Sequence, residues 1–303
     1  MFIVDMHCDS LSAVNSERGL VGKHNFSRRY PQLQFVAEFV PKRGMPPEMR
    51  RKELMHYLDM FIAEYQRLKL VDVRTCHDLN FAIECEKNAV ILAVEGGGGL
   101  FADSEELNTL YRMGLRVLGL AWDSNELAAS CYEENDYGLT PEGAEMVRRC
   151  SELGIIMDVS HLSDRAFYQL TEQTAYPVIA THSNFREVCN HPRNLTRDMA
   201  EKIVSRGGII GLNLYPELLS GEKSATKDDL FRHVDYALER FGAQSLAFGF
   251  DIDGTGGRYP RGFLENDSFH DRICELLLKR YPEQTVAKIA GENVINFLKG
   301  TMD

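Results

Sequence analysis

The sequence predicts an α/β protein, a (β/α)8 barrel of the TIM type that forms a single domain over residues 1–303. Short apolar, β-branched runs alternate with amphipathic stretches along the whole chain, the order expected of parallel strands joined by helices. There are eight such runs, the number of strands in this barrel. No linker or internal repeat divides the chain, and barrels of this length are commonly undivided.

The predicted strands are mostly continuous in apolar character, as expected for parallel strands that are covered on both faces. In chain order they are residues 2–4, 35–40, 90–94, 115–121, 154–159, 177–180, 208–214 and 245–250. Amphipathic stretches predict helices over residues 48–70, 79–86, 105–113, 141–153, 164–171, 197–206 and 227–241.

Capping signals support several of these helix boundaries. Thr140 followed by Pro141 is a favoured pair of N-cap and first helical residue, and Thr196 and Thr226 precede polar first turns. Glycine follows several of the predicted helices, as at Gly154, because glycine readily adopts the left-handed conformation that ends a helix.

A doubly wound α/β sheet is the competing fold, and it would place a glycine-rich loop after an early strand. The best candidate is the segment 95–99, Glu-Gly-Gly-Gly-Gly. It matches neither GxGxxG nor GxxxxGKS/T. We therefore favour the barrel, in which these glycines let the backbone pass close to the site.

The composition excludes several kinds of partner. A net charge of -11 argues against nucleic acid or an anionic membrane as the partner. No segment approaches the roughly 18 apolar residues of a membrane span, and the N-terminus lacks the basic lead and long apolar region of a secretory signal. The seven cysteines are dispersed, without a CxxC pair, which indicates reduced thiols and a cytoplasmic location.

The first predicted strand ends in two polar residues, His7 and Asp9. Side chains two residues apart point to the same side of a strand, whereas Cys8 between them is expected to point away and to be packed. One imidazole and one carboxylate on one face make half of a metal site.

Polar residues also follow other predicted strands, and together the set is His7, Asp9, Glu95, Trp122, Asp123, His161, His182 and Asp251. The C-terminal ends of barrel strands converge on one mouth, so six of these residues, the three histidines with Asp9, Glu95 and Asp251, are expected to meet there. Neutral imidazole and carboxylate suit Zn²⁺, with Mn²⁺ or Fe²⁺ as alternatives. Three histidines and two carboxylates exceed the ligands of one catalytic zinc and suit two metals that share a carboxylate and a water. Asp251 is then left as the general base and acid.

Any single histidine near a strand end is more often a hydrogen-bonded structural residue. That interpretation is kept for the histidines outside the set: His24, His56, His77, His191, His233 and His270.

At these residues the chain resembles the membrane (renal) dipeptidase family of zinc peptidases, within the metal-dependent amidohydrolase-like barrels. The matching segments are residues 7–9, 94–97, 158–161, 181–183, 191–196 and 249–254, with similar text at 213–215 and 291–294. The resemblance spans the whole chain in order. It implies that His7 and Asp9 bind one Zn²⁺, that His161 and His182 bind the second, and that Glu95 bridges them.

The resemblance also implies a reaction: a hydroxide between the zinc ions attacks the amide of a dipeptide while Asp251 transfers the proton. Arg193 is implied to hold the free carboxylate of the substrate, to which a guanidinium can donate two hydrogen bonds. Tyr215 is a candidate for the pocket wall, with a core or rim position as the alternative. The family further implies a homodimer as a possible assembly.

The chain departs from the mammalian members at Trp122, where they have a histidine. The indole N–H donates one hydrogen bond and cannot take a proton as imidazole can, so Trp122 either donates that bond or forms an apolar wall. Three alternatives to a dipeptidase therefore stay open. They are a hydrolase of another small amide or ester, such as an N-acyl amino acid or lactone; a weakly active metal-binding protein; and a metal-free structural barrel.

Overall fold

The computed structural model describes residues 1–10, 26–39, 45–100, 104–263 and 268–302. Within them, eight parallel strands form one sheet in the order β6-β5-β4-β2-β1-β8-β7, with β3 paired to β4 beside this path. The strands are β1 (Ile3–Cys8), β2 (Gln32–Phe39), β3 (Val71–Asp72), β4 (Ala89–Glu95), β5 (Leu115–Gly119), β6 (Ile156–Asp158), β7 (Ile210–Leu212) and β8 (Leu246–Phe248).

The sheet closes through the predicted strand 177–180. That segment makes two isolated parallel bridges, from Ile179 to Asp158 at the end of β6 and from Ala180 to Ile210 at the start of β7. The predicted α/β barrel is thus confirmed, although its sixth strand is reduced to these bridge residues. The two-residue strand β3 was not predicted because it is too short to show a pattern.

One strand boundary was also missed. The second strand starts at Gln32 rather than at residue 35. Its start was missed because its first residues include the polar Gln32 and Gln34, which hydrogen-bond to each other. Its predicted last residue, Val40, lies outside the described part of the chain.

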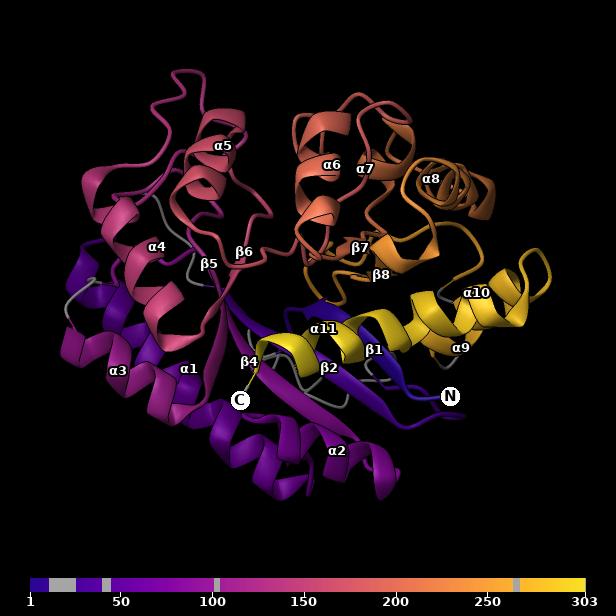
Figure 1. Ribbon diagram of the computed structural model, residues 1–303, viewed down its shortest axis with the longest axis horizontal. Helices are drawn as coiled ribbons and strands as arrows, with labels where there is room; N and C mark the ends of the chain where they lie inside the picture. The colour runs from indigo at the N-terminus through magenta and orange to yellow at the C-terminus, as the bar shows by residue number, and fades with distance from the viewer. Residues whose placement is uncertain (11–25, 40–44, 101–103, 264–267, 303) are drawn as a thin grey trace.

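Helices surround the strands (Figure 1). They are α1 (Pro47–Arg67), α2 (Cys76–Glu84), α3 (Ser104–Met113), α4 (Pro141–Leu153), α5 (Asp164–Gln173), α6 (Arg197–Ser205), α7 (Pro216–Ser220), α8 (Lys227–Arg240), α9 (Phe269–Leu278), α10 (Glu283–Ala287) and α11 (Asn293–Thr301), with the short 3-10 helix η2 (Ala243–Ser245) and the π-helical turn η3 (Lys288–Glu292). All seven predicted helices are present. Four further α-helices in the described part of the chain were not predicted. The segments α7 and α10 are too short to show a 3.6-residue period, and α9 and α11 follow the last strand, so no later strand marks where they end.

The residues predicted to cap helices do so in the structure. The Thr140 hydroxyl accepts from Gly143 N at 3.0 Å, and the Thr196 hydroxyl accepts from Met199 N. Gly154 ends α4 in the left-handed conformation at φ 73°. These local bonds fix where each helix begins and ends, and hence how long the loops are between helix and strand.

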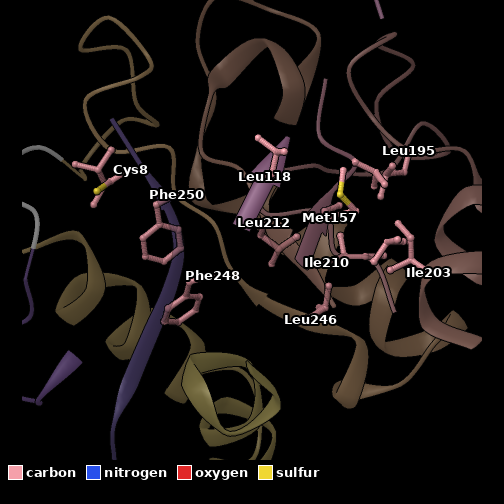
Figure 2. Packing of buried hydrophobic residues seen from close by; sticks show 14 of the residues in the cluster. Cys8, Leu118, Met157, Leu195, Ile203, Ile210, Leu212, Leu246, Phe248 and Phe250 are labelled. Atoms are coloured by element: carbon pink, nitrogen blue, oxygen red, sulfur yellow. The ribbon is translucent and has the colours of Figure 1, made fainter. Parts of the chain in front are cut away.

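Two layers of apolar side chains lie on the two faces of the sheet. One includes alternate residues of β1 and β2, such as Val4 and Phe35, with Leu298 of α11, which closes the barrel interior at one end. The other faces the surrounding helices and includes Phe248 and Phe250. These two rings lie one beyond the other beside β1 (Figure 2), with their centroids 4.5 Å apart.

Among the helices in the described residues, none combines the length and the apolar character needed to cross a bilayer.

Candidate metal centre

The six residues predicted to meet at the barrel mouth do lie together. Each comes from the C-terminal end of a strand or from the residues just beyond it. They form three overlapping groups whose possible ligand atoms all lie within 4.8 Å of one another. The groups are His7, Asp9 and Glu95; Glu95, His161 and His182; and His7, His182 and Asp251.

A β-bulge places His7 in this cluster. Asp5 pairs with Gln34 of β2 and Cys8 pairs with Val36, so three steps along β1 match two along β2. Such an extra residue re-aims the side chains at a strand end. His7 Nε2 lies 3.7 Å from Asp9 Oδ2, whereas Cys8 packs among the helix-facing apolar residues, as the sequence predicted.

Glu95 lies at the centre of the cluster. Its Oε1 is 2.9 Å from His161 Nε2 and 3.2 Å from His182 Nε2, and its Oε2 is 3.7 Å from His7 Nε2. The two carboxylate oxygens therefore face two different sets of donors, which is the arrangement of a bridging carboxylate.

The donor atoms fit a cation. His7 Nε2 and Glu95 Oε1 are buried without a hydrogen-bond partner among the described residues, and a buried polar atom without a partner costs about 1–3 kcal/mol. The Nε2 atoms of His161 and His182 are only 3.0 Å apart. Lone pairs converging in a buried site are stabilised by a metal ion.

Asp158 and Thr181 set the tautomer of His182. The Thr181 hydroxyl donates to Asp158 Oδ2, so its oxygen can only accept from His182 Nδ1, which lies 2.7 Å away. A proton on Nδ1 leaves Nε2 unprotonated and directed at the cluster. Outer carboxylates commonly orient metal-binding histidines in this way. The sequence pattern did not assign this role to either residue, because it follows from a contact between the end of β6 and the residue after the bridge at Ala180.

The protonation of the cluster follows from burial and from the carboxylates. Burial lowers the pKa of His7, but the charges of Glu95, Asp9 and Asp251 outweigh it and raise this pKa to about 10, so a cation that binds His7 must displace a proton. Burial raises the pKa of Glu95 to about 7. Burial and the positive charge of Arg193 hold the pKa of His161 well below its usual value, so that imidazole is neutral, the form that binds metals.

Asp251 is held by its backbone and by Asn213. Its φ of 58° lies in the left-handed region, which a non-glycine residue adopts at some energetic cost. Asn213 Nδ2 donates to Asp251 Oδ2 at 3.0 Å, while Asp251 Oδ1 lies 4.0 Å from His7 Nε2. A Cβ atom added at Gly254 would overlap the carboxylates of both Asp251 and Asp9, so glycine is required there.

A cavity of about 350 Å³ opens beside the cluster, and it is lined by His161 and Asp251 and by the predicted substrate residues Trp122, Arg193 and Tyr215. The structure thus brings every predicted site residue to one mouth. The volume of the cavity is at the lower end of the range for small-molecule sites.

Arg193 offers this cavity a buried positive charge. Only 4% of the residue is exposed. Its Nη1 donates to Ser183 Oγ at 2.7 Å and its Nη2 donates to the His182 carbonyl at 3.0 Å. Both partners are neutral, so the guanidinium retains its full charge for an anionic ligand.

Trp122 and Tyr215 form walls of the cavity. The Trp122 ring packs edge-on against Phe39 at 4.5 Å and lies 6.2 Å from the His161 ring. Tyr215 is covered by the guanidinium of Arg258 at 4.5 Å, which also hydrogen-bonds to its hydroxyl. Arg258 lines the cavity too. It was missed because it lies in an irregular glycine-rich loop.

Two of the histidines interpreted as structural are confirmed as buried and hydrogen-bonded. His233 Nε2 lies 3.1 Å from the Leu219 carbonyl, and His270 Nε2 lies 2.8 Å from Asp5 Oδ2. His24 lies outside the described residues.

Comparisons with known proteins support the resemblance. The sequence model of the membrane dipeptidase family, peptidase family M19, matches residues 3–302. A protein encoded in the 5′ region of pqqA in Klebsiella pneumoniae is 28% identical over 243 residues, which cover 77% of this chain and 87% of that protein. Dipeptidase tcpJ of Claviceps purpurea is 29% identical over 221 residues, which cover 72% of this chain and 52% of that protein. Mouse dipeptidase 3 is 26% identical over 311 residues, which cover 99% of this chain and 62% of that protein. The chain thus spans between half and two thirds of the length of these two dipeptidases.

Solved structures show the same fold. A dipeptidase of family M19 superposes with a TM-score of 0.87 at 22% identity, covering 100% of this chain and 99% of that chain. A metallopeptidase from Rhodobacter sphaeroides, solved with a phosphinate mimic of L-Ala-D-Ala, has a TM-score of 0.86 at 21% identity and covers 99% of both chains. The family match over nearly the full length decides the classification: the chain belongs to the membrane dipeptidase family, peptidase family M19, the metallopeptidase family that its sequence motifs predicted.

Proposed function

We propose that this protein is a dipeptidase that works with two divalent cations, with Zn²⁺ as the expected metal and Mn²⁺ or Fe²⁺ as alternatives. His7 and Asp9 would hold one ion, His161 and His182 the other, and Glu95 both. The observation that carries the proposal is the position of Glu95, whose two oxygens face separate donor sets. When bound, the two cations would lower the pKa of a shared water and polarise the scissile carbonyl.

Asp251 is the residue that moves the proton. Asn213 holds its Oδ2 at 3.0 Å, which leaves Oδ1 directed at the cluster. Burial and the nearby charge of Asp9 raise the pKa of Asp251, so it can accept a proton from water and pass it on. A side chain that acts as general base and then as general acid works best when its pKa lies near the working pH, so a raised carboxylate pKa suits this role. The proton goes from Oδ1 to the amide nitrogen as the peptide bond breaks.

Arg193 selects substrates that end in a carboxylate close to the scissile bond. It is buried, and its two hydrogen-bond partners in the structure are neutral, so a substrate carboxylate is the group that complements it. The cavity of about 350 Å³ between Arg193 and the cluster suits a short substrate. Trp122 and Tyr215 bound this cavity and contact the substrate side chains.

Trp122 supports one second candidate, a hydrolase of N-acyl amino acids, which also present a carboxylate to Arg193. In the mammalian members the histidine at this position is implied to polarise the substrate carbonyl or to stabilise the developing oxyanion. Loss of one such donor typically costs about 100-fold in rate, which opens the question of which substrate this site hydrolyses best. A panel of dipeptides assayed beside N-acetyl amino acids and lactones, with zinc-loaded protein, separates the candidates. We expect the highest kcat/KM on a dipeptide. A preference for an N-acyl amino acid or a lactone would contradict the dipeptidase proposal.

A further inference from the structure

A buried carboxylate behind the metal centre touches the backbone of two functional residues. Asp5 lies on β1, two residues before His7, and is fully buried. Its Oδ1 accepts from His7 N at 3.2 Å and from Phe250 N at 3.1 Å. Phe250 directly precedes Asp251. The single atom Asp5 Oδ1 therefore links the end of β1, which carries His7, to the segment after β8, which carries Asp251.

The backbone ladder alone does not hold these strand ends together. β1 and β8 pair at Asp5 and Phe248, and the next pairing is the isolated bridge from Cys8 to Ile252. Between these points three steps on one strand face four on the other, and the bulge in β1 falls in the same stretch. His7 lies in this irregular interval, and the Asp5 side chain supplies the bonds that the ladder lacks.

His270 holds the other oxygen of Asp5. Its Nε2 lies 2.8 Å from Asp5 Oδ2, and both side chains are fully buried. His270 belongs to the first turn of α9, and its ring packs against Phe250 with centroids 5.1 Å apart. A buried carboxylate needs such a partner, because an unpaired one is costly in the protein interior. The Asp5 side chain reaches the candidate metal cluster through its hydrogen bond from the His7 backbone.

We infer that Asp5 and His270 form a positioning pair, which fixes the ligand His7 and so the affinity of the centre for metal, and which also fixes the position of Asp251 relative to that ligand. This inference rests on the metal centre proposed above. A pair that only fastened α9 to the barrel would change stability and leave the metal centre as it is. The two roles therefore differ in a direct measurement of metal binding, which needs no substrate.

The test compares zinc affinity, measured by competition with a chromophoric chelator, in four variants of the full chain. Asp5→Asn and His270→Asn are expected to weaken zinc binding about 10- to 100-fold, the usual effect of losing an outer-shell partner, and to lower kcat more than they change KM. His270→Gln, which has one more methylene with which to reach Asp5, is expected to stay within about threefold of wild type. The double variant Asp5→Asn/His270→Asn should be no worse than either single one, because the two residues act as a unit.

His233→Asn is the matched control, since His233 is another fully buried histidine, hydrogen-bonded to the Leu219 carbonyl. It should lower the melting temperature but leave zinc affinity unchanged. Equal zinc affinity in wild type, Asp5→Asn and His270→Asn would overturn the inference, as would a loss in His233→Asn as large as theirs. If His270→Asn does not fold, a His270→Gln variant that folds but binds zinc 10-fold more weakly or worse would also overturn it. Wild-type protein that binds zinc but cleaves no dipeptide would refute the proposed function and leave this comparison intact.

Discussion

At the scale of the residue, the Asp251 carboxylate is positioned both by its backbone conformation and by a side-chain hydrogen bond. Its left-handed φ of 58° and the hydrogen bond from Asn213 fix the carboxylate beside the metal cluster, with Oδ1 4.0 Å from His7 Nε2. Asp253, two residues on, has a similar φ of 70° but hydrogen-bonds to Ser10. The two residues form a natural comparison.

The variant Asp251→Asn should lower kcat about 100- to 10,000-fold, the usual contribution of a positioned acid and base. Its zinc content should match wild type, because five other side chains supply the donors of the centre. Metal analysis and steady-state kinetics check both points. Asp253→Asn should keep kcat within a few-fold, and full activity of Asp251→Asn would refute the assigned role.

The variant Arg193→Ala should raise KM for a dipeptide about 10- to 100-fold, since a charge-assisted hydrogen bond to a carboxylate contributes about 1.5–3 kcal/mol. KM for the corresponding dipeptide amide, which lacks the carboxylate, should change little. Arg186→Ala is the control, because Arg186 is bonded to Asp164 instead. Equal increases in KM for both substrates would show that Arg193 does not bind the substrate carboxylate.

Glu38 predicts an unusual pH dependence of stability. It is buried on β2, and neither carboxylate oxygen has a hydrogen-bond partner in the described part of the chain. Burial, with the charges of Asp9 and Glu53, raises its pKa from 4.5 to about 10. Below pH 4.5 the group is neutral in both folded and unfolded chains. As the pH rises from there toward 10, the unfolded chain releases the proton that the folded chain keeps, so stability falls.

Glu38→Gln, which is neutral at every pH, should therefore be more stable than wild type at pH 8 by about 1–3 kcal/mol. The difference should shrink to about 0.4 kcal/mol at pH 4.5, where Glu38 is neutral in the folded chain and only half ionised in the unfolded chain. Urea unfolding at the two pH values measures it, with the exposed Glu172→Gln on α5 as the control. A difference that is the same at both pH values would contradict the assignment of a neutral Glu38.

At the scale of the element, the site depends on how strands end. The loop after β8 carries Asp251 and then returns at Gly254 to lie against the carboxylates of Asp251 and Asp9. The strand β1 ends in a bulge that turns His7 toward Glu95. Irregular backbone at these two ends, more than the regular barrel, gives the cluster its geometry.

The variant Gly254→Ala should weaken zinc binding by at least about 10-fold, because the added methyl displaces Asp251 and Asp9, and loss of support around a ligand typically costs that much. Gly256→Ala is the control in the same loop. Gly256 has a φ of 62° and no atom within 4 Å of an added Cβ, so alanine there strains the backbone by about 1–2 kcal/mol and leaves zinc affinity unchanged. Normal zinc affinity in Gly254→Ala would contradict the close approach.

The order of strands and the positions of the metal-cluster residues could be predicted from the sequence, because apolar runs mark strands and His161 or Asp251 follow such runs directly. The bulge in β1 could not, since it arises from the pairing of β1 with β2. The contacts of Asp5 with His270 and of Thr181 with Asp158 also escaped prediction. They join residues that only the folded barrel brings together.

At the scale of the whole molecule, the family match and the fold agree. A full-length match to the membrane dipeptidase family and a closed parallel barrel confirm the predicted fold and enzyme class. A homodimer and a cytoplasmic location stay predictions, as does the identity of the metal. Trp122 is exposed at the mouth of the cavity, and we expect a difference in substrate preference from the mammalian members to arise there.

We propose that dipeptide hydrolysis by this protein requires two metal ions, which Glu95 would hold between two pairs of ligands. The most direct measurement titrates Zn²⁺ into chelator-treated protein and follows bound zinc and dipeptide hydrolysis in the same samples. We predict that binding saturates at two ions per chain and that hydrolysis reaches its maximum there. Saturation at one ion or fewer per chain, or hydrolysis that persists in the chelated protein, would contradict the account.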